Sequence, residues 1–288
     1  MQTFQTASTS DGLALHGVHW AADTPLAAVS LVHGFGEHCG RYEHLAAHLN
    51  SQGISVVGVD LHGHGKTEGP RGVARSYDHI HGDVKTLIEE TASLYPGLPN
   101  FLFGHSMGGG LVLHHGLHTE DDLLAGYLVS APLIRLKRNI PALARVAVKT
   151  MRPLLPGGTF PIPVAGVNIS SIVEEQQRYD NDPLNHNRLG FGLAVGMIEA
   201  GEQMLANAGD WKKPLRLWHS RDDRITNFDA SQEFAGLASN CEFTSFADVQ
   251  HEMHQDVSRG EVYALMVDYV LGRCASPQPG RVRSQPEA

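Results

Sequence analysis

The segment LPNFLFGHSMGGGLVLHHG, residues 98–116, joins a strand-like run to a helical pattern through a single serine. Residues 101–103 are apolar in succession, as in a strand buried on both faces, and an apolar helical pattern resumes at 111–113. Between them, Ser106 is the centre of a G-x-S-x-G sequence at 104–108. In the turn known as a nucleophile elbow, this sequence lifts a serine hydroxyl out of a sheet, and the glycines allow close packing. Five residues alone fit a glycine-rich turn with an inert serine equally well, so the rest of the chain must decide.

Strand-like and helical segments alternate along much of the chain. Short β-branched or aromatic runs predict buried strands at 27–34, 54–60, 100–106, 124–132, 214–220 and 241–248. Helical segments lie between the early strands, for example at 41–53, where Gly53 is a typical helix stop. The first residues predict an antiparallel hairpin that turns at Asp11-Gly12. This alternation predicts a mostly parallel central sheet flanked by helices.

The alternation stops between residues 136 and 210, where no strand-like run recurs and prolines interrupt the chain. A stretch of this length is too long for a loop, so we expect an inserted, mainly helical cap. The α/β core is then divided into a first part, 1–135, and a second part, 211–274. The polar, proline-rich residues 275–288 are predicted to be a disordered tail.

The first part of this cap is strongly basic. From Ala131 to Val173 the chain has no acidic residue, and its six basic residues are Arg135, Lys137, Arg138, Arg145, Lys149 and Arg152. Residues 141–155 predict an amphipathic helix, with basic and apolar residues on different faces. Such a helix can make peripheral contact with an anionic membrane. The alternative is the ordinary solvated face of a helix that packs on the core.

Composition restricts the classes of function. The 288 residues include 22 lysines and arginines against 31 aspartates and glutamates, and this net charge of −9 argues against nucleic-acid binding. Three cysteines, with no basic and then apolar signal at the N-terminus, are expected to be free thiols in the cytoplasm. No run approaches the roughly 18 apolar residues that a membrane-spanning helix requires.

The 18 histidines raise the question of a metal site. The sequence HEMH at 251–254 is similar to the zinc motif H-E-x-x-H, but its histidines are three residues apart rather than four. We therefore expect neither a metal nor another cofactor.

A nucleophilic serine needs a base and an acid from elsewhere in the chain. In folds with this elbow the chain order is serine, then aspartate or glutamate, then histidine. Asp222 and Asp223 follow one of the last two predicted strands, and His251 and His254 follow the other. Groups at the carboxyl ends of parallel strands meet at one edge of the sheet. The order therefore predicts an acid from the first pair and a base from the second.

The chain also contains six motifs, in the order HGFGEH (33–38), DLHGHGKTEGPRG (60–72), GHSMGG (104–109), DPL (182–184), SRDDRI (220–225) and HEMH (251–254). Together they resemble the monoacylglycerol lipase and lysophospholipase-like branch of the α/β-hydrolases. The resemblance extends from the N-terminus to about Leu271, and only 135–181 is loosely matched. It implies an α/β-hydrolase fold with an inserted cap.

The resemblance also selects the site residues. It implies Ser106 as the nucleophile, His251 as the base and, of the two neighbouring aspartates, Asp223 as the acid. The residue after the nucleophile, Met107, is expected to offer one backbone amide to the oxyanion. The resemblance implies Phe35 as the second donor.

These observations predict a serine esterase or lipase that hydrolyses esters of single-chain lipids, foremost monoacylglycerols, through an acyl-enzyme on Ser106. A lysophospholipase, a short-chain carboxylesterase and an acyltransferase are alternatives within the same chemistry. A non-catalytic ligand receptor is the alternative from another class, because a fold alone does not imply activity.

Overall fold

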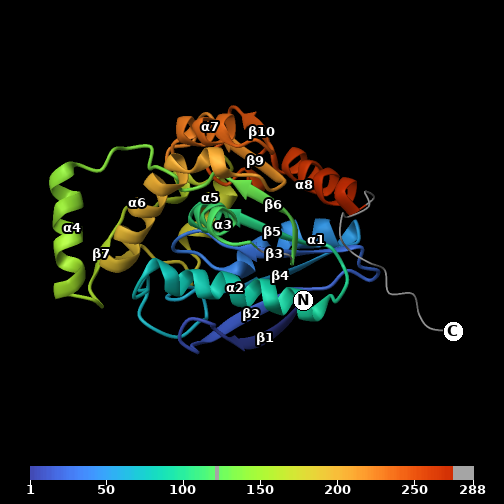
Figure 1. Cartoon of the computed structure of the whole chain (residues 1–288), viewed down its shortest axis with the longest axis horizontal. Helices are drawn as coiled ribbons and strands as arrows, with labels where there is room; N and C mark the ends of the chain where they lie inside the picture. The colour runs from blue at the N-terminus through green and yellow to red at the C-terminus, as the bar shows by residue number, and fades with distance from the viewer. Residues whose placement is uncertain (121–122, 275–288) are drawn as a thin grey trace.

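The computed structural model describes residues 1–120 and 123–274. Its centre is an eight-stranded sheet in the order β1-β2-β4-β3-β5-β6-β9-β10 (Figure 1). The strands are β1 (Gln2–Ala7), β2 (Ala14–Trp20), β3 (Ala27–Val32), β4 (Ile54–Val59), β5 (Asn100–His105), β6 (Leu124–Ser130), β9 (Leu215–Ser220) and β10 (Cys241–Phe246). Neighbours run parallel from β4 to β10, and β2 is antiparallel to both β1 and β4. The predicted mostly parallel sheet is confirmed; the predicted tail, 275–288, lies outside the described residues.

Helices cover both faces of this sheet. They are α1 (Glu43–Ser51), α2 (Tyr77–Leu94), α3 (Met107–His118), α4 (Ala142–Leu154), α5 (Val173–Asp180), α6 (Phe191–Ala206), α7 (Phe228–Leu237) and α8 (Arg259–Cys274). Strands β3, β4 and β5 are buried along their whole length. In β3, Val29 and Leu31 pack on the side of α1 and α8, whereas Ala28 and Val32 pack on the side of α2 and α3. This double burial explains why the central strands are continuous apolar runs.

The predicted N-terminal hairpin is confirmed. Strands β1 and β2 pair antiparallel, and Gly12 takes a positive φ of 77° at the turn between them. The Leu13 amide donates to the Asp11 carboxylate at 3.0 Å, as expected for an aspartate that opens a tight turn.

The expectation that no strand recurs between 136 and 210 is wrong for two short segments. Strands β7 (Thr159–Pro161) and β8 (Arg188–Gly190) pair antiparallel in a separate small sheet. Each has three residues, and β7 ends in a proline, so neither is long enough to show the period of two that identifies a strand in a sequence.

Helices α4 and α6 lie side by side but differ in how they contact the core (Figure 1). Helix α6 buries Met204 fully, and Gly201 touches the backbone so closely that a Cβ there would lie 2.0 Å from the Ile134 carbonyl oxygen. Helix α4 has no buried residue and lies at the edge of the molecule. Within residues 1–120 and 123–274, no helix is both long enough and apolar enough to cross a bilayer.

Candidate active site

Ser106 lies at the sharp turn between β5 and α3. Its φ of 56° and ψ of −118° are strained for a residue that carries a Cβ. Three backbone hydrogen bonds hold this conformation: the Ser106 amide donates to the Ser130 carbonyl at 3.0 Å, and the Ser106 carbonyl accepts from the amides of Gly110 at 3.0 Å and Leu133 at 2.8 Å. The local backbone therefore has the geometry of a nucleophile elbow.

The two glycines of G-x-S-x-G are required by close packing. A Cβ on Gly104 would lie 2.3 Å from the carbonyl oxygen of Gly108, and a Cβ on Gly108 would lie 2.2 Å from that of Val32. Neither separation is compatible with a side chain. The glycines therefore allow the first turn of α3 to pack directly against the ends of β3 and β5.

The loops after β9 and β10 bring Asp223 and His251 together. His251 Nδ1 lies 2.6 Å from Asp223 Oδ2, and both side chains are buried. Burial opposes the charge on Asp223, but the His251 ring and a hydrogen bond from His219 hold the pKa of this carboxyl well below its usual range. Burial likewise opposes the charge on His251, yet the Asp223 carboxylate raises the pKa of the ring above its usual value. The two groups form a buried pair in which each favours the charged form of the other.

Further donors surround the Asp223 carboxylate. Its Oδ1 accepts the amides of Ile225 at 2.7 Å and Thr226 at 3.0 Å, and its Oδ2 accepts the Thr226 hydroxyl at 2.8 Å. His219 Nε2 lies 2.9 Å from the same Oδ2. The neighbouring Asp222 is exposed, and its carboxylate instead accepts the Asp248 amide at 2.8 Å. The structure thus places Asp223, and not Asp222, beside His251.

Ser106 and His251 line the same cavity. The ring of His105, next to Ser106 in the chain, lies with its centroid 4.6 Å from that of His251. Among the described residues, no hydrogen bond joins the Ser106 hydroxyl to His251. Without a substrate such catalytic contacts are often long, and they shorten when the substrate binds.

The loop after β3 carries Phe35 past Ser106. A Cβ on Gly34 would lie 3.3 Å from Cβ of Ser106, so this loop touches the elbow. Glu37 Oε1 accepts hydrogen bonds from the Gly34 amide at 2.6 Å and from the Tyr42 hydroxyl at 2.8 Å. These two bonds hold the loop after β3 in place. Within the described chain, no acceptor is paired with the amide of Phe35 or with that of Met107 in the first turn of α3. Both amides are available to a ligand at Ser106.

A buried arginine that sequence reasoning missed connects this loop to the loop of His251. Arg41 donates to both carboxylate oxygens of Glu252, at 2.6 Å and 2.8 Å, and also to Glu37. Burial works against the charge, but Glu252 and Glu37 raise the pKa of Arg41 well above its usual value. The signal in the sequence was Glu252, the acidic residue directly after His251 in HEMH.

The second histidine of HEMH contributes packing. The His254 ring stacks on the Tyr42 ring at 4.8 Å between centroids, and burial lowers the pKa of His254 to about 3. Among the described residues, no group of three or more histidine, cysteine, aspartate or glutamate side chains is arranged to hold a metal ion.

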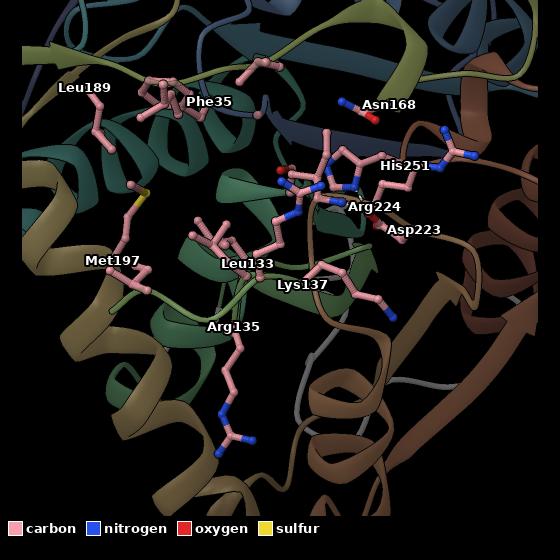
Figure 2. Close-up of a pocket in the computed structure, with 18 of the residues that line it drawn as sticks. Phe35, Leu133, Arg135, Lys137, Asn168, Leu189, Met197, Asp223, Arg224 and His251 are labelled. Atoms are coloured by element: carbon pink, nitrogen blue, oxygen red, sulfur yellow. Dashed lines mark hydrogen bonds and ion pairs between the residues drawn. The ribbon is translucent and has the colours of Figure 1, made fainter. Parts of the chain in front are cut away.

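The cavity at Ser106 has a volume of about 1280 Å³ and two chemically different sides. In Figure 2, Phe35, Leu189 and Met197 lie on one side of the cavity, and Asp223, Arg224 and His251 lie on the other. Much of the apolar wall comes from the chain between β6 and β9, including residues of α4, β7 and α6. Such a cavity suits an ester with one apolar chain and one polar end.

Comparisons with known proteins find a matching family and similar lipases. A family model described as "Hydrolase_4: Serine aminopeptidase, S33" matches residues 23–258. The chain is 31% identical over 211 residues to the monoacylglycerol lipase of Mycolicibacterium smegmatis, with 72% of this chain and 74% of that protein covered. It is 35% identical over 260 residues to an uncharacterized abhydrolase domain-containing protein of Dictyostelium discoideum, covering 86% of this chain but only 27% of that longer protein. The crystal structure of the Paleococcus ferrophilus monoacylglycerol lipase matches with a TM-score of 0.81 at 28% identity, covering 90% of this chain and 99% of that one.

Proposed function

The chain belongs to the Hydrolase_4 family, described as serine aminopeptidase, S33, and on this premise we propose that it hydrolyses carboxylic esters of single-chain lipids, foremost monoacylglycerols. The relatives from M. smegmatis and P. ferrophilus are named for this activity. The observation that carries the proposal is the strained Ser106 in one cavity with the buried Asp223–His251 pair and an apolar wall.

The proposed chemistry uses the three side chains in sequence. Ser106 Oγ attacks the ester carbonyl while His251 takes the hydroxyl proton on Nε2. His251 Nδ1–H donates a hydrogen bond to the Asp223 carboxylate, so that Nε2 is left without a proton and can act as the base. The same carboxylate stabilises the imidazolium that forms when Nε2 takes the proton. When the carbon–oxygen bond to the alcohol breaks, His251 returns its proton to the leaving oxygen and the acyl group stays on Ser106. Water then repeats the steps and releases the fatty acid.

The negative charge on the tetrahedral intermediate needs donors that are already in place. We assign this role to the amides of Phe35 and Met107, because the Phe35 loop touches the elbow and Met107 begins α3. For the acyl chain, we assign the apolar wall that residues 136–210 largely supply, and we treat this segment as the cap of a core made of 1–135 and 211–274.

The proposal is tested by fatty-acid release from a long-chain monoacylglycerol, a lysophospholipid and a short-chain ester, with wild type and Ser106→Ala in parallel. We expect the monoacylglycerol to be the best substrate, with release lost in Ser106→Ala. A fluorophosphonate probe should label the wild type and not the variant. An aminoacyl anilide is included because the family description names an aminopeptidase.

The other outcomes separate the alternatives. Turnover of the short ester alone would keep the serine chemistry and restrict the cavity to small substrates. Labelling that persists in Ser106→Ala would identify another nucleophile. Neither labelling nor turnover by the wild type would favour the ligand-receptor alternative.

We also propose that α4 contacts anionic membranes from which the substrate enters. Apolar side chains on this part of the chain are exposed to solvent: Leu143 by 81%, Val146 by 61%, Leu154 by 66% and Leu155 by 52%. Of the basic residues that predicted this contact, Arg145 and Lys149 pair with Glu202 and Glu199 of α6. Electrostatic attraction is then left to Arg138 and Arg152, for which the described chain offers no carboxylate partner.

Co-sedimentation with vesicles tests this contact. Binding to vesicles that contain phosphatidylglycerol should fall as salt is added and should weaken in Leu143→Ser/Val146→Ser. The control is Leu237→Ser, which changes an equally apolar side chain, 52% exposed, at the end of α7. Equal binding to neutral vesicles, or equal loss in the control, would refute the proposal.

We place the protein in the cytoplasm. Its cysteines, Cys39, Cys241 and Cys274, are free thiols, which is typical of a reducing compartment. Fluorescence microscopy of the tagged full chain tests this placement, and export from the cell would contradict it.

A further inference from the structure

A short antiparallel contact brings two cationic segments to the rim of the catalytic cavity. Leu136 forms a β-bridge with Thr226, the Lys137 amide donates to the Ile225 carbonyl at 2.9 Å, and the Asn227 amide donates to the Arg135 carbonyl at 2.9 Å. The first segment leaves the end of β6, and the second leaves the loop that carries Asp223. The contact therefore fixes Lys137 beside the acid of the catalytic site.

Four cations that line the cavity have no acidic side chain at ion-pair distance among the described residues: Lys137, Arg138, Arg221 and Arg224. Of these, Lys137 and Arg224 adjoin the hydrogen bond from the Lys137 amide to the Ile225 carbonyl. Arg135, on the same segment as Lys137, is paired with Glu233 at 3.2 Å. The carboxylate of Asp223, next to Arg224 in the chain, is already engaged by His251, His219 and Thr226.

The charge of Lys137 acts on His219, a hydrogen-bond partner of Asp223. The buried His219 ring, a partner of Asp223, has a pKa lowered mainly by burial, and Lys137 adds to the lowering. Unpaired cations in the cavity that Ser106 lines are unexpected in a chain whose net charge is −9. They would repel a cationic ligand, leave a neutral one unaffected and attract an anion.

The positions of the lining residues predict where such an anion would bind. If the scissile carbonyl lies at Ser106 and the acyl chain lies along Phe35, Leu189 and Met197, the alcohol side of the ester is directed to the opposite side of the cavity, where Figure 2 shows Asp223, Arg224 and His251. A phosphate on that alcohol would face Lys137 and Arg224. Lysine binds phosphate as a point charge and arginine through two parallel hydrogen bonds.

We infer that Lys137 and Arg224 form a headgroup subsite for phosphate, so that the substrates include single-chain glycerol esters with an anionic phosphate headgroup. This inference rests on the proposed ester hydrolysis at Ser106. It assigns the two cations a role in substrate choice, separate from the chemistry of bond cleavage.

The test compares two soluble substrates without vesicles: decanoyl monoacylglycerol and decanoyl glycerol phosphate, each below its micelle concentration. The measured quantity is the ratio of kcat/KM for the phosphate ester to that for the neutral ester. In Lys137→Gln/Arg224→Gln this ratio should fall about fivefold to tenfold, the size expected for two solvent-exposed ion pairs. Added salt should lower the wild-type ratio, because exposed charges are screened.

Arg135→Gln is the matched control. It removes one charge from the same segment and from the lining of the same cavity, but this guanidinium is paired with Glu233. We expect the ratio in this variant to stay within about twofold of wild type, the size of the weakest exposed ion pair. An equal fall in Arg135→Gln would overturn the subsite, because it would reveal a general charge effect.

The remaining outcomes distinguish the two proposals. If the wild type hydrolyses the neutral ester and not the phosphate ester, the headgroup subsite is wrong and the proposed function stands. If it hydrolyses neither and Ser106 resists the fluorophosphonate, the proposed function itself fails. An unchanged ratio in the double variant, together with weaker binding to anionic vesicles, would assign the cations to a bilayer surface instead.

Discussion

Asp222 and Asp223 are adjacent in the chain, yet their carboxylates bind different partners. Asp223 accepts hydrogen bonds from a histidine pair and from its own loop, whereas Asp222 accepts the Asp248 amide at the surface. Asp223→Asn should therefore lower kcat on monoacylglycerol by about four orders of magnitude, the loss seen when the acid of a serine hydrolase becomes an amide. Asp222→Asn, the matched control, should stay within about threefold, as a surface change does. Equal losses would overturn the choice of acid.

The raised pKa of His251 predicts the acidic limb of the pH profile. Attack by Ser106 needs a neutral ring, so kcat/KM should rise with pH and reach half its plateau at the pKa of the free enzyme. Because Asp223 raises this pKa in spite of burial, the midpoint should lie above the ordinary value of about 6.5. In Asp223→Asn the ring loses its charge partner and burial dominates, so its titration, followed by NMR, should move to lower pH. A wild-type midpoint below the ordinary value would contradict this assignment.

Among the elements, the loops after β3 and β10 are coupled by one side chain. Arg41 binds Glu37, which holds the Gly34 amide, and Glu252, which follows His251. Arg41→Lys keeps the charge but cannot form the same planar pair. We expect a loss of kcat with little change in KM, and a decrease of about 1–3 kcal/mol in the free energy of unfolding, because a buried partner is left unsatisfied.

The control for this variant is Arg216→Lys, because Arg216 pairs with Glu242 between neighbouring strands where the glutamate is 53% exposed. An exposed pair contributes about 0–1 kcal/mol, so neither activity nor stability should change much. Denaturant unfolding and steady-state kinetics on both variants supply the comparison. If Arg41→Lys loses stability but keeps kcat, the arginine supports the fold without positioning the two loops.

Features that are encoded in one continuous stretch of residues could be predicted from the sequence. Features that depend on contacts between residues far apart in the chain could not. The β5–Ser106–α3 turn was readable because an apolar run, two glycines and a helical pattern adjoin in one segment. The Arg41–Glu252 pair joins residues 211 positions apart and produces no periodic pattern. Strands β7 and β8 are too short to have a period. The choice between Asp222 and Asp223 needed the family resemblance, because both residues follow the same strand.

In the molecule as a whole, the segments between β6 and β9 differ in how firmly they are attached. Contacts that tie the part around α5 to the core include the His186 amide to the Gly36 carbonyl at 2.8 Å, His38 to Asp182 at 3.0 Å, and the Ser171 amide to Asp256 at 2.9 Å. Helix α4 is attached through exposed ion pairs with α6 and has no buried residue. Stability should therefore be unevenly distributed across one molecule.

Amide hydrogen exchange of the full chain should reveal this distribution. We expect the amides of α4 to exchange orders of magnitude faster than those of α3, whose residues are mostly buried, with α5 between them. Because Ala144 and Val148 of α4 line the catalytic cavity, a long-chain alkyl phosphonate attached to Ser106 should slow exchange in α4 and leave α8 unchanged. A short methyl phosphonate is the control, since it reaches Ser106 but not α4. Slowing by the short probe as well would mean that α4 responds to the chemistry at the serine and not to an acyl chain, and the apolar wall would then lose its assigned role.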